Sequence, residues 1–251
     1  MDFTNKRVLI TGGSRGIGRA TAIAFAEAGA RVAINFHADK NAAAQAIEML
    51  PGEGHFAVRA DISHPEAVEQ LVNAAVQEME GLDILVNNAG LFFAHPIDSS
   101  NYEEWQSAWH RTLNTNLIGA ANLCYCAAQQ MMKQGGGRIV NVSSRGAYRG
   151  EPGQPAYGAS KAGMNAMSQS LAQALAPYNI FVGAVAPGFV ETDMTRELLE
   201  SEAGTGLRSQ SPTGRVAQPE EVAHCILFLA SEQAAFTTGC VLDVNGASYL
   251  H

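Results

Sequence analysis

The stretch RVLITGGSRGIGRATAIAFAEAG, residues 7–29, joins an apolar run, a glycine-rich loop and an alanine-rich amphipathic run. The apolar run at 7–11 is typical of a buried β-strand, because its Val, Leu and Ile residues do not alternate with polar ones. The run at 16–29 is predicted to form a helix. Strand, glycine loop and helix in this order predict the first unit of an α/β fold with a phosphate-binding loop.

The same alternation recurs along the chain and predicts one α/β domain over residues 1–251. We expect a doubly wound, mostly parallel sheet of seven strands with helices on both faces, which is a Rossmann fold. Ligands bind such sheets beyond the carboxyl ends of the strands. The strand-like runs after the first lie at 31–36, 55–61, 82–90, 137–144, 180–188 and 240–246, and helical runs lie at 40–50, at 65–79, up to Lys133 and around Tyr157.

Composition excludes several classes of protein. The net charge is −8 and no run of Lys and Arg forms a basic stripe, so we expect no nucleic-acid partner. The apolar runs are too short or too interrupted to span a bilayer, so we expect no membrane partner. Residues 1–6, MDFTNK, lack the features of a signal peptide, and we expect a cytoplasmic protein.

Four cysteines are present, at Cys124, Cys126, Cys225 and Cys240. Their spacing matches neither a CxxC motif nor a metal framework. We therefore predict reduced thiols in the core and no metal site.

The loop TGGSRGIG at 11–18 suits a dinucleotide. Gly12, Gly16 and Gly18 have no side chains to block a pyrophosphate, and a helix N-terminus offers free N–H groups. Its spacing, TGxxxGxG, differs from the common GxGxxG fingerprint. A plain structural turn is the alternative, although the position between the first strand and helix favours binding.

Tyr157 and Lys161 stand four positions apart in AYGASK, residues 156–161, so a helix would place them on one face. A tyrosine has a pKa of about 10, and a neighbouring ammonium group is expected to lower it. The phenol is then able to exchange a proton with a carbonyl or an alcohol. A buried tyrosine beside a surface lysine is the alternative for this pair alone.

Six motifs in order resemble the short-chain dehydrogenase/reductase family over nearly the full chain. They are TGGSRGIG at 11–18, NNAG at 87–90, LNTNLIG around Asn116, VSS ending at Ser144, YGASK at 157–161 and APGFVETDM at 186–194.

The resemblance implies a role for four side chains. Tyr157 is the general acid and base, and Lys161 also bonds the nicotinamide ribose. Ser144 holds the substrate oxygen, and Asn116 holds a water molecule of a proton relay. The cofactor carries the hydride, so no covalent nucleophile is needed.

The resemblance also implies the cofactor contacts, with Val190 and Thr192 near the carboxamide and Asp61 and Ile62 near the adenine. The full set is Gly12, Ser14, Arg15, Gly16, Ile17 and Gly18 in the glycine loop, Phe36 and His37, Asp61 and Ile62, Asn88, Ala89 and Gly90, Tyr157 and Lys161, and Pro187, Gly188, Val190 and Thr192.

The end of the second strand favours NADP(H) over NAD(H). An acidic residue there would bond the ribose 2′-OH and repel a 2′-phosphate, but the family's acidic position falls on Phe36. Asp39 lies three residues further on. Arg15 and either His37 or Lys40 are candidate partners of the phosphate, although solvated surface charges are the alternative.

The expected substrate is a small ketone or secondary alcohol. We predict a lid over 188–212 and an apolar wall, and Arg145 or Arg149 either meets an anionic group or lies in a solvated loop. Within the family the chain is most similar to 3-oxoacyl-(acyl-carrier-protein) reductases, so a 3-oxoacyl thioester is a candidate. The predicted wall consists of Leu91, Phe92, Phe93 and His95.

Basic residues dock the carrier protein in those reductases, whereas the corresponding positions here are Gln134, Gly135 and Tyr178, with Lys133 nearby. This departure argues against a carrier-protein partner.

The alternatives to the reductase are an NAD-linked alcohol dehydrogenase and a non-catalytic dinucleotide sensor. The resemblance also implies a homotetramer, in which helices at 101–133 and 157–176 pair and the C-terminal segment makes a second contact.

Overall fold

The computed structural model describes residues 1–193 and 195–251. Met194, which ends the APGFVETDM motif within the predicted lid, lies outside the described residues. In chain order the elements are β1 (Arg7–Ile10), α1 (Gly16–Glu27), β2 (Arg31–Phe36), α2 (Lys40–Glu48), β3 (Phe56–Arg59), α3 (Pro65–Met79), β4 (Ile84–Asn87), α4 (Tyr102–Leu113), the π-helix η1 (Asn114–Gly119), α5 (Ala120–Lys133), β5 (Gly137–Val142), α6 (Gly146–Arg149), α7 (Pro155–Leu175), the 3₁₀-helix η2 (Ala176–Tyr178), β6 (Ile180–Pro187), α8 (Arg196–Glu200), α9 (Ala203–Ser209), α10 (Pro219–Ala230), the 3₁₀-helix η3 (Glu232–Thr237) and β7 (Val241–Val244).

The described residues form one sheet of seven parallel strands in the order β3-β2-β1-β4-β5-β6-β7. The chain builds outward from β1 to β3, then crosses back to place β4 on the other side of β1. In the register, Val8 lies beside Val32 of β2 and Ile84 of β4. The predicted doubly wound parallel sheet is confirmed. The reversal between β1 and β4 is the point at which such sheets bind ligands.

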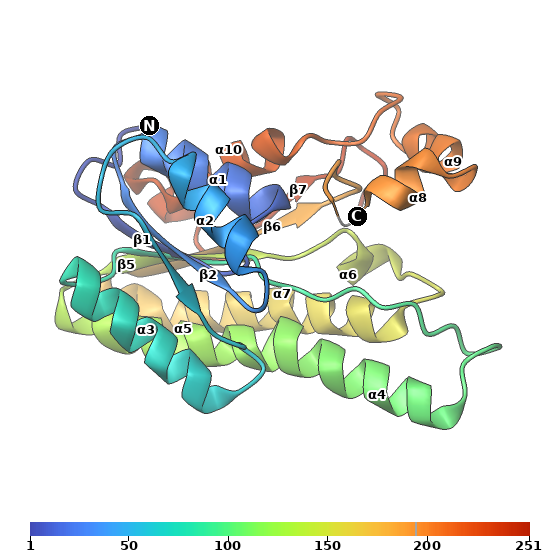
Figure 1. The fold of residues 1–251 in the computed structure, drawn as a ribbon, viewed down its shortest axis with the longest axis horizontal. Coiled ribbons are helices and arrows are strands. Elements are labelled where there is room, and N and C mark those ends of the chain that lie inside the picture. The colour runs from blue at the N-terminus through green and yellow to red at the C-terminus, as the bar shows by residue number, and fades with distance from the viewer. Residues whose placement is uncertain (194) are drawn as a thin grey trace.

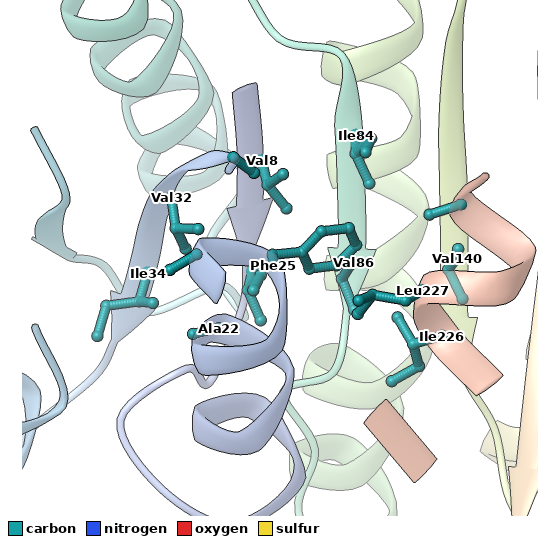
Figure 2. Packing of buried hydrophobic residues seen from close by; sticks show 14 of the residues in the cluster. Val8, Ala22, Phe25, Val32, Ile34, Ile84, Val86, Val140, Ile226 and Leu227 are labelled. Atoms are coloured by element: carbon teal, nitrogen blue, oxygen red, sulfur yellow. The ribbon is translucent and has the colours of Figure 1, made fainter. Parts of the chain in front are cut away.

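Helices cover both faces of the sheet (Figure 1). Helices α1, α2 and α10 pack on one face, and α3, α5 and α7 pack on the other. On the first face, Phe25 of α1 lies among the strand valines and isoleucines, and Ile226 and Leu227 of α10 approach the same cluster (Figure 2). Phe25 is fully buried, and burial of such a side chain contributes about 1.5–3 kcal/mol.

The predicted lid at 188–212 contains the short helices α8 and α9, which stand apart from the two helical layers (Figure 1, orange). Val190 and Ala217 form a single parallel bridge that ties the start of this segment to the chain after it. The movement of the segment remains a prediction.

An ion pair joins the amino ends of β1 and β4. The Arg7 guanidinium donates to both carboxylate oxygens of Asp83, with Nε–Oδ2 at 2.7 Å and Nη2–Oδ1 at 2.9 Å. The Arg7 backbone N–H also donates to Oδ2 at 2.8 Å. Partial burial would raise the pKa of Asp83, but the hydrogen bonds from Arg7 outweigh it and hold that pKa below its usual value.

We expect Asp83→Asn to lower the free energy of unfolding by about 1–3 kcal/mol at pH 7, because the Arg7 charge loses its carboxylate. The folded-state pKa of Asp83 lies below the unfolded value, so its stabilisation is present above about pH 4 and is lost as the pH falls through the folded-state pKa. Urea unfolding of both proteins between pH 7 and pH 3 measures the difference.

Glu48→Gln is the matched control, because Glu48 is exposed and has no ion pair among the described residues. It should change the free energy of unfolding by less than about 0.5 kcal/mol. A difference between wild type and Asp83→Asn that stays constant down to pH 3 would contradict the assignment.

Candidate active site

A cavity of about 840 Å³ opens at the carboxyl edge of the sheet. Its walls come from the loops after β1, β2, β3, β4, β5 and β6 and from the first turns of α7. Both ends of the cavity therefore lie on segments held by the same parallel sheet.

The glycine loop has the backbone that the sequence predicts. Gly12 and Gly16 have φ of 63° and 53°, in the left-handed region that favours glycine. A Cβ at Gly18 would lie 2.3 Å from the Gly12 carbonyl oxygen and 2.5 Å from Asn88 Nδ2. The loop is therefore folded tightly on the start of α1, where no side chain fits.

Asn88 joins this loop to the NNAG segment after β4. Its Nδ2 donates to the carbonyl oxygens of Thr11 at 2.8 Å and Gly12 at 3.1 Å. In return, Thr11 Oγ1 accepts from the backbone N–H groups of Asn88 and Ala89 at 3.1 and 3.0 Å. The first two predicted motifs are thus parts of one hydrogen-bonded junction.

Ser144 and Tyr157 meet at the other end of the cavity. Ser144 follows β5, and its Oγ accepts from the Gly146 N–H at 3.0 Å. A Cβ at Gly146 would lie 3.3 Å from this Oγ and 3.7 Å from Tyr157 Cε1, so the two side chains flank Gly146. The Phe92 ring stands edge-on to the Tyr157 ring, with centroids 5.0 Å apart and planes at 89°. Tyr157 lies in the first turn of α7, so the helix and β5 together fix its position.

Lys161 lies one helical turn beyond Tyr157, as the spacing predicts. Its side chain is buried, and its Nζ donates to the Val142 carbonyl oxygen at 2.7 Å and stands 5.8 Å from the Tyr157 ring centroid. Burial lowers the pKa of Lys161 to about 8, because an ammonium loses hydration there.

The pKa of Tyr157 differs from the sequence-based expectation. Burial raises it above its usual value, the Glu151 carboxylate adds to the rise, and the hydrogen bond with Ser144 opposes it. The Lys161 ammonium donates to the Val142 carbonyl oxygen, and desolvation of the phenolate is the largest influence on the Tyr157 pKa. The phenol is therefore protonated at neutral pH and is able to donate a proton.

Asn116 lies in η1, a π-helical turn between α4 and α5. Such turns are rare and occur often at functional sites. The Asn116 side chain accepts from the Leu91 N–H at 2.7 Å and donates to the Leu91 carbonyl at 2.9 Å. A Cβ at Gly90 would lie 3.5 Å from Asn116 Oδ1 and 3.7 Å from Lys161 Nζ, so Gly90 lies directly against both side chains.

Most of the predicted site residues line this cavity, but Gly18 and Asn116 do not. Gly18 is buried against the glycine loop, and Asn116 lies behind Leu91. The residues that do line it are Gly12, Ser14, Arg15, Gly16, Ile17, Phe36, His37, Asp61, Ile62, Asn88, Ala89, Gly90, Ser144, Tyr157, Lys161, Pro187, Gly188, Val190 and Thr192.

The predicted apolar wall is only half correct. Leu91 and Phe92 line the cavity, whereas Phe93 and His95 do not. Phe93 is half-buried and packs against the Arg111 guanidinium, whose Cζ lies 4.3 Å from its ring centroid. His95 is buried, with Nδ1 2.9 Å from the Phe93 carbonyl and Nε2 accepting from the Ala156 N–H at 3.2 Å. It supports the start of α7 and does not face a substrate.

Sequence reasoning missed several residues of the cavity, among them Arg111, Glu151, Phe189 and Thr195. Phe189 stands inside the APGFVETDM motif, so its position next to Gly188 was a usable signal. The other three come from loops and a helix end whose placement depends on tertiary packing.

The residues present fit a dinucleotide. The glycine loop leaves a cradle that a Cβ at Gly16 would narrow, since it would lie 3.2 Å from Thr192 Cγ2. No side chain caps the N-terminus of α1, so its N–H groups are free to bind a pyrophosphate. The cavity continues from this cradle to Ser144 and Tyr157, where hydride transfer and proton transfer have room to occur together.

Fold and site together define a dinucleotide-dependent oxidoreductase with a Ser–Tyr–Lys constellation. A profile of the family described as "Enoyl-(Acyl carrier protein) reductase" matches residues 12–247. The 3-oxoacyl-(acyl-carrier-protein) reductase of Vibrio cholerae is 39% identical over 250 residues, covering all of both chains, and that of Staphylococcus aureus is 37% identical over 247 residues, covering 98% of both. The chain belongs to the short-chain dehydrogenase/reductase family and is an oxidoreductase of that family.

Solved structures support the same family assignment. A short-chain dehydrogenase from Burkholderia cenocepacia in complex with NADP has a TM-score of 0.91 at 32% identity, covering 99% of both chains. A dehydrogenase/reductase from Sinorhizobium meliloti has a TM-score of 0.92 at 30% identity, covering 99% of this chain and 97% of the other. These neighbours have the same single-domain architecture over nearly every residue.

The described residues lack two features. Among residues 1–193 and 195–251, no helix combines the length and apolar character needed to cross a membrane. The same part of the chain holds no group of three His, Cys, Asp or Glu side chains placed to bind a metal ion.

We expect Gly18→Ala to weaken dinucleotide binding at least about tenfold, because the added methyl group must push the Gly12 carbonyl and Asn88 out of place. Fluorescence titration with NADPH and with NADH measures the change. Gly206→Ala is the control, since a Cβ there meets nothing within 4 Å and the residue lies in α9. Equal binding by the Gly18 variant and wild type would contradict the tight junction.

Proposed function

We propose that this protein transfers a hydride between NADPH and a ketone, forming a secondary alcohol. The pairing of Ser144 with a protonated Tyr157 at the end of a cavity that begins at a glycine loop carries this proposal. A bound nicotinamide supplies the hydride. The chain's own task is to hold the carbonyl oxygen and to give it a proton.

Each of the four side chains has a separate task. The Ser144 hydroxyl orients the carbonyl oxygen, and the Tyr157 phenol donates the proton to it. Lys161 holds the nicotinamide ribose and, when protonated, favours the phenolate that the transfer leaves behind. Asn116, through its contact with the Leu91 backbone, supports the water molecule that returns a proton to the site.

NADPH is the proposed cofactor because Phe36 stands at the position where an acidic side chain would repel the 2′-phosphate of NADPH. Arg15 and His37 line the same part of the cavity and are available to the phosphate. The His37 Nε2 stands 3.5 Å from Asp61 Oδ2 and is largely exposed.

Asp39 also lines the cavity, but its Oδ1 already accepts from the Ala42 N–H at 2.9 Å as the cap of α2. An NAD-linked alcohol dehydrogenase is the second candidate, because Asp39 has a further carboxylate oxygen.

A 3-oxoacyl thioester belongs among the candidate ketones, since the relatives from V. cholerae and S. aureus are named for that activity. Docking of a carrier protein has less support. Gln134 is engaged with the core, donating to the Leu82 carbonyl at 2.6 Å, and Tyr178 is an exposed neutral side chain. A free thioester or another small ketone therefore suits this surface better than a carrier-bound one.

We also infer a homotetramer, as the resemblance predicts. Ile118 and Tyr125, on η1 and α5, are 46% and 67% exposed, and Phe236 and Leu250 near the C-terminus are more exposed still. Apolar side chains in these two regions suit the two contacts expected between subunits. Sedimentation equilibrium should give four times the chain mass of 26.5 kDa, and a monomer would overturn the inference.

The purified protein should oxidise NADPH in the presence of a carbonyl compound, with a higher kcat/KM than for NADH. The panel contains acetoacetyl-CoA, diketones, quinones, aldehydes and sugars. Tyr157→Phe should lower kcat at least about 100-fold, because the proton donor is lost while the ring contact with Phe92 remains.

Arg15→Ala is the companion variant. It should reduce the preference for NADPH over NADH while leaving the Tyr157-dependent chemistry in place. Tight binding of cofactor with no turnover of any carbonyl would favour a dinucleotide sensor over an enzyme, and preferential turnover with NADH would favour the NAD-linked dehydrogenase.

A further inference from the structure

A buried guanidinium forms part of the substrate end of the cavity. Arg145 directly follows Ser144, and only 3% of its surface is exposed to solvent. It lines the main cavity together with Glu151, Tyr157 and Phe189, and it also lines a smaller adjoining cavity of about 160 Å³. A cation is costly to bury unless an anion or several hydrogen bonds compensate it.

The close partners of Arg145 are uncharged. Its Nη1 donates to Ser248 Oγ at 2.7 Å, its Nη2 donates to Gln210 Oε1 at 2.5 Å, and its carbon atom Cζ stands 4.8 Å from the Phe189 ring centroid. The nearest carboxylate, Glu151, forms an ion pair with Arg145 at 3.9 Å from Nε, a separation too long for a hydrogen bond. A guanidinium has five N–H groups, so three have no hydrogen-bond partner among the described residues.

A second guanidinium converges on the same neutral acceptor. Arg149 Nη1 donates to Gln210 Oε1 at 2.9 Å, so two cations share one amide oxygen. Burial lowers the pKa of Arg145, the charge of Arg149 lowers it further, and Glu151 opposes the change. Two guanidinium groups meet on one neutral oxygen, and among the described residues Glu151 pairs only with Arg145, so this corner of the site retains positive charge.

The other charged groups of this region are already paired. Arg215 bonds Glu221 at 2.7 Å, and Asp243 lies 3.5 Å from His251 Nδ1. Arg215, Glu221 and Asp243 line the smaller cavity, and none of them forms an ion pair with Arg145. The compensation is therefore expected from a molecule that enters the site.

We propose that Arg145, assisted by Arg149, binds a carboxylate of the substrate, so that the ketone reduced here is an oxo acid. This inference rests on the proposed function and specifies its substrate class. The Gln210 amide oxygen already accepts a hydrogen bond from Arg145, as one oxygen of a substrate carboxylate would, but it carries no charge. A carboxylate would add the missing charge and accept two N–H groups at once. Since Arg145 and Ser144 are adjacent, the carboxylate lies on the same wall as the group that holds the carbonyl oxygen.

The test compares oxo acids of increasing length with their neutral methyl esters: acetoacetate, 4-oxopentanoate and 5-oxohexanoate against methyl acetoacetate, methyl 4-oxopentanoate and methyl 5-oxohexanoate. We expect at least one acid to exceed its ester about tenfold in kcat/KM, chiefly through a lower KM. Arg145→Met should reduce this acid-to-ester ratio at least about tenfold, and Arg149→Met should reduce it less. Equal or lower activity on all three acids in the wild type would overturn the proposal.

Two further variants separate binding from folding. Arg31→Met is the matched control, because Arg31 pairs with Glu78 and does not line the site; its acid-to-ester ratio should equal that of wild type. Arg145→Lys keeps a charge but not the planar fork, and should retain part of the preference. If Arg145 only ties Gln210 to the body of the protein, Arg145→Met and Gln210→Ala will slow acid and ester equally, and the proposal fails.

A binding measurement distinguishes this proposal from the reductase itself. Calorimetric titration of 4-oxopentanoate into the protein with NADP⁺ requires no turnover. Binding in wild type that is lost in Arg145→Met supports the carboxylate site even if no carbonyl in the panel is reduced. Equal binding in both proteins, or none in either, overturns it. Reduction of neutral ketones alone leaves the reductase intact and removes the carboxylate site.

Discussion

The Asn88 amide and the Thr11 hydroxyl hold together the two loops on which the rest of the site depends. Their hydrogen bonds link the loops after β1 and β4, where the strand order reverses and the sheet leaves space beyond its carboxyl edge. Gly18 packs directly against this junction. Because the helix, the glycine loop and the NNAG segment are joined here, the cradle for a pyrophosphate is formed before any ligand binds, which reduces the entropic cost of binding.

Burial controls the chemistry at the opposite end of the cavity. The same desolvation that raises the pKa of Tyr157 lowers the pKa of Lys161 to about 8. A phenol that keeps its proton is suited to reducing a carbonyl, and removal of its proton is needed for the reverse reaction. The Val142 carbonyl holds the Lys161 ammonium in place. The effect of this charge on the Tyr157 pKa therefore depends on the molecule that occupies the cavity beside it.

The substrate end differs in character from the cofactor end. Exposed Arg15 and His37 belong to the wall near the glycine loop, whereas the buried Arg145 meets Glu151 and Phe189 at the substrate end. A relative with 37–39% identity over the whole chain shares the fold, but fold alone does not decide the substrate. The buried Arg145, which hydrogen bonds only neutral acceptors among the described residues, is the feature of this site that bears most directly on the substrate.

The sequence by itself determined the parallel sheet, the glycine loop and the Ser–Tyr–Lys set, because these depend on local patterns: continuous apolar runs, glycines that must lack a Cβ, and two side chains one helical turn apart. It also indicated Asn88, although its hydrogen bonds to Thr11 and Gly12 connect segments more than 70 residues apart. Tertiary structure alone decided that Phe93 and His95 turn away from the cavity, that burial raises the pKa of Tyr157, and that Arg145 and Arg149 share Gln210. The physical reason is that burial and charge balance at a position are set by residues distant in the chain, and no local pattern records them.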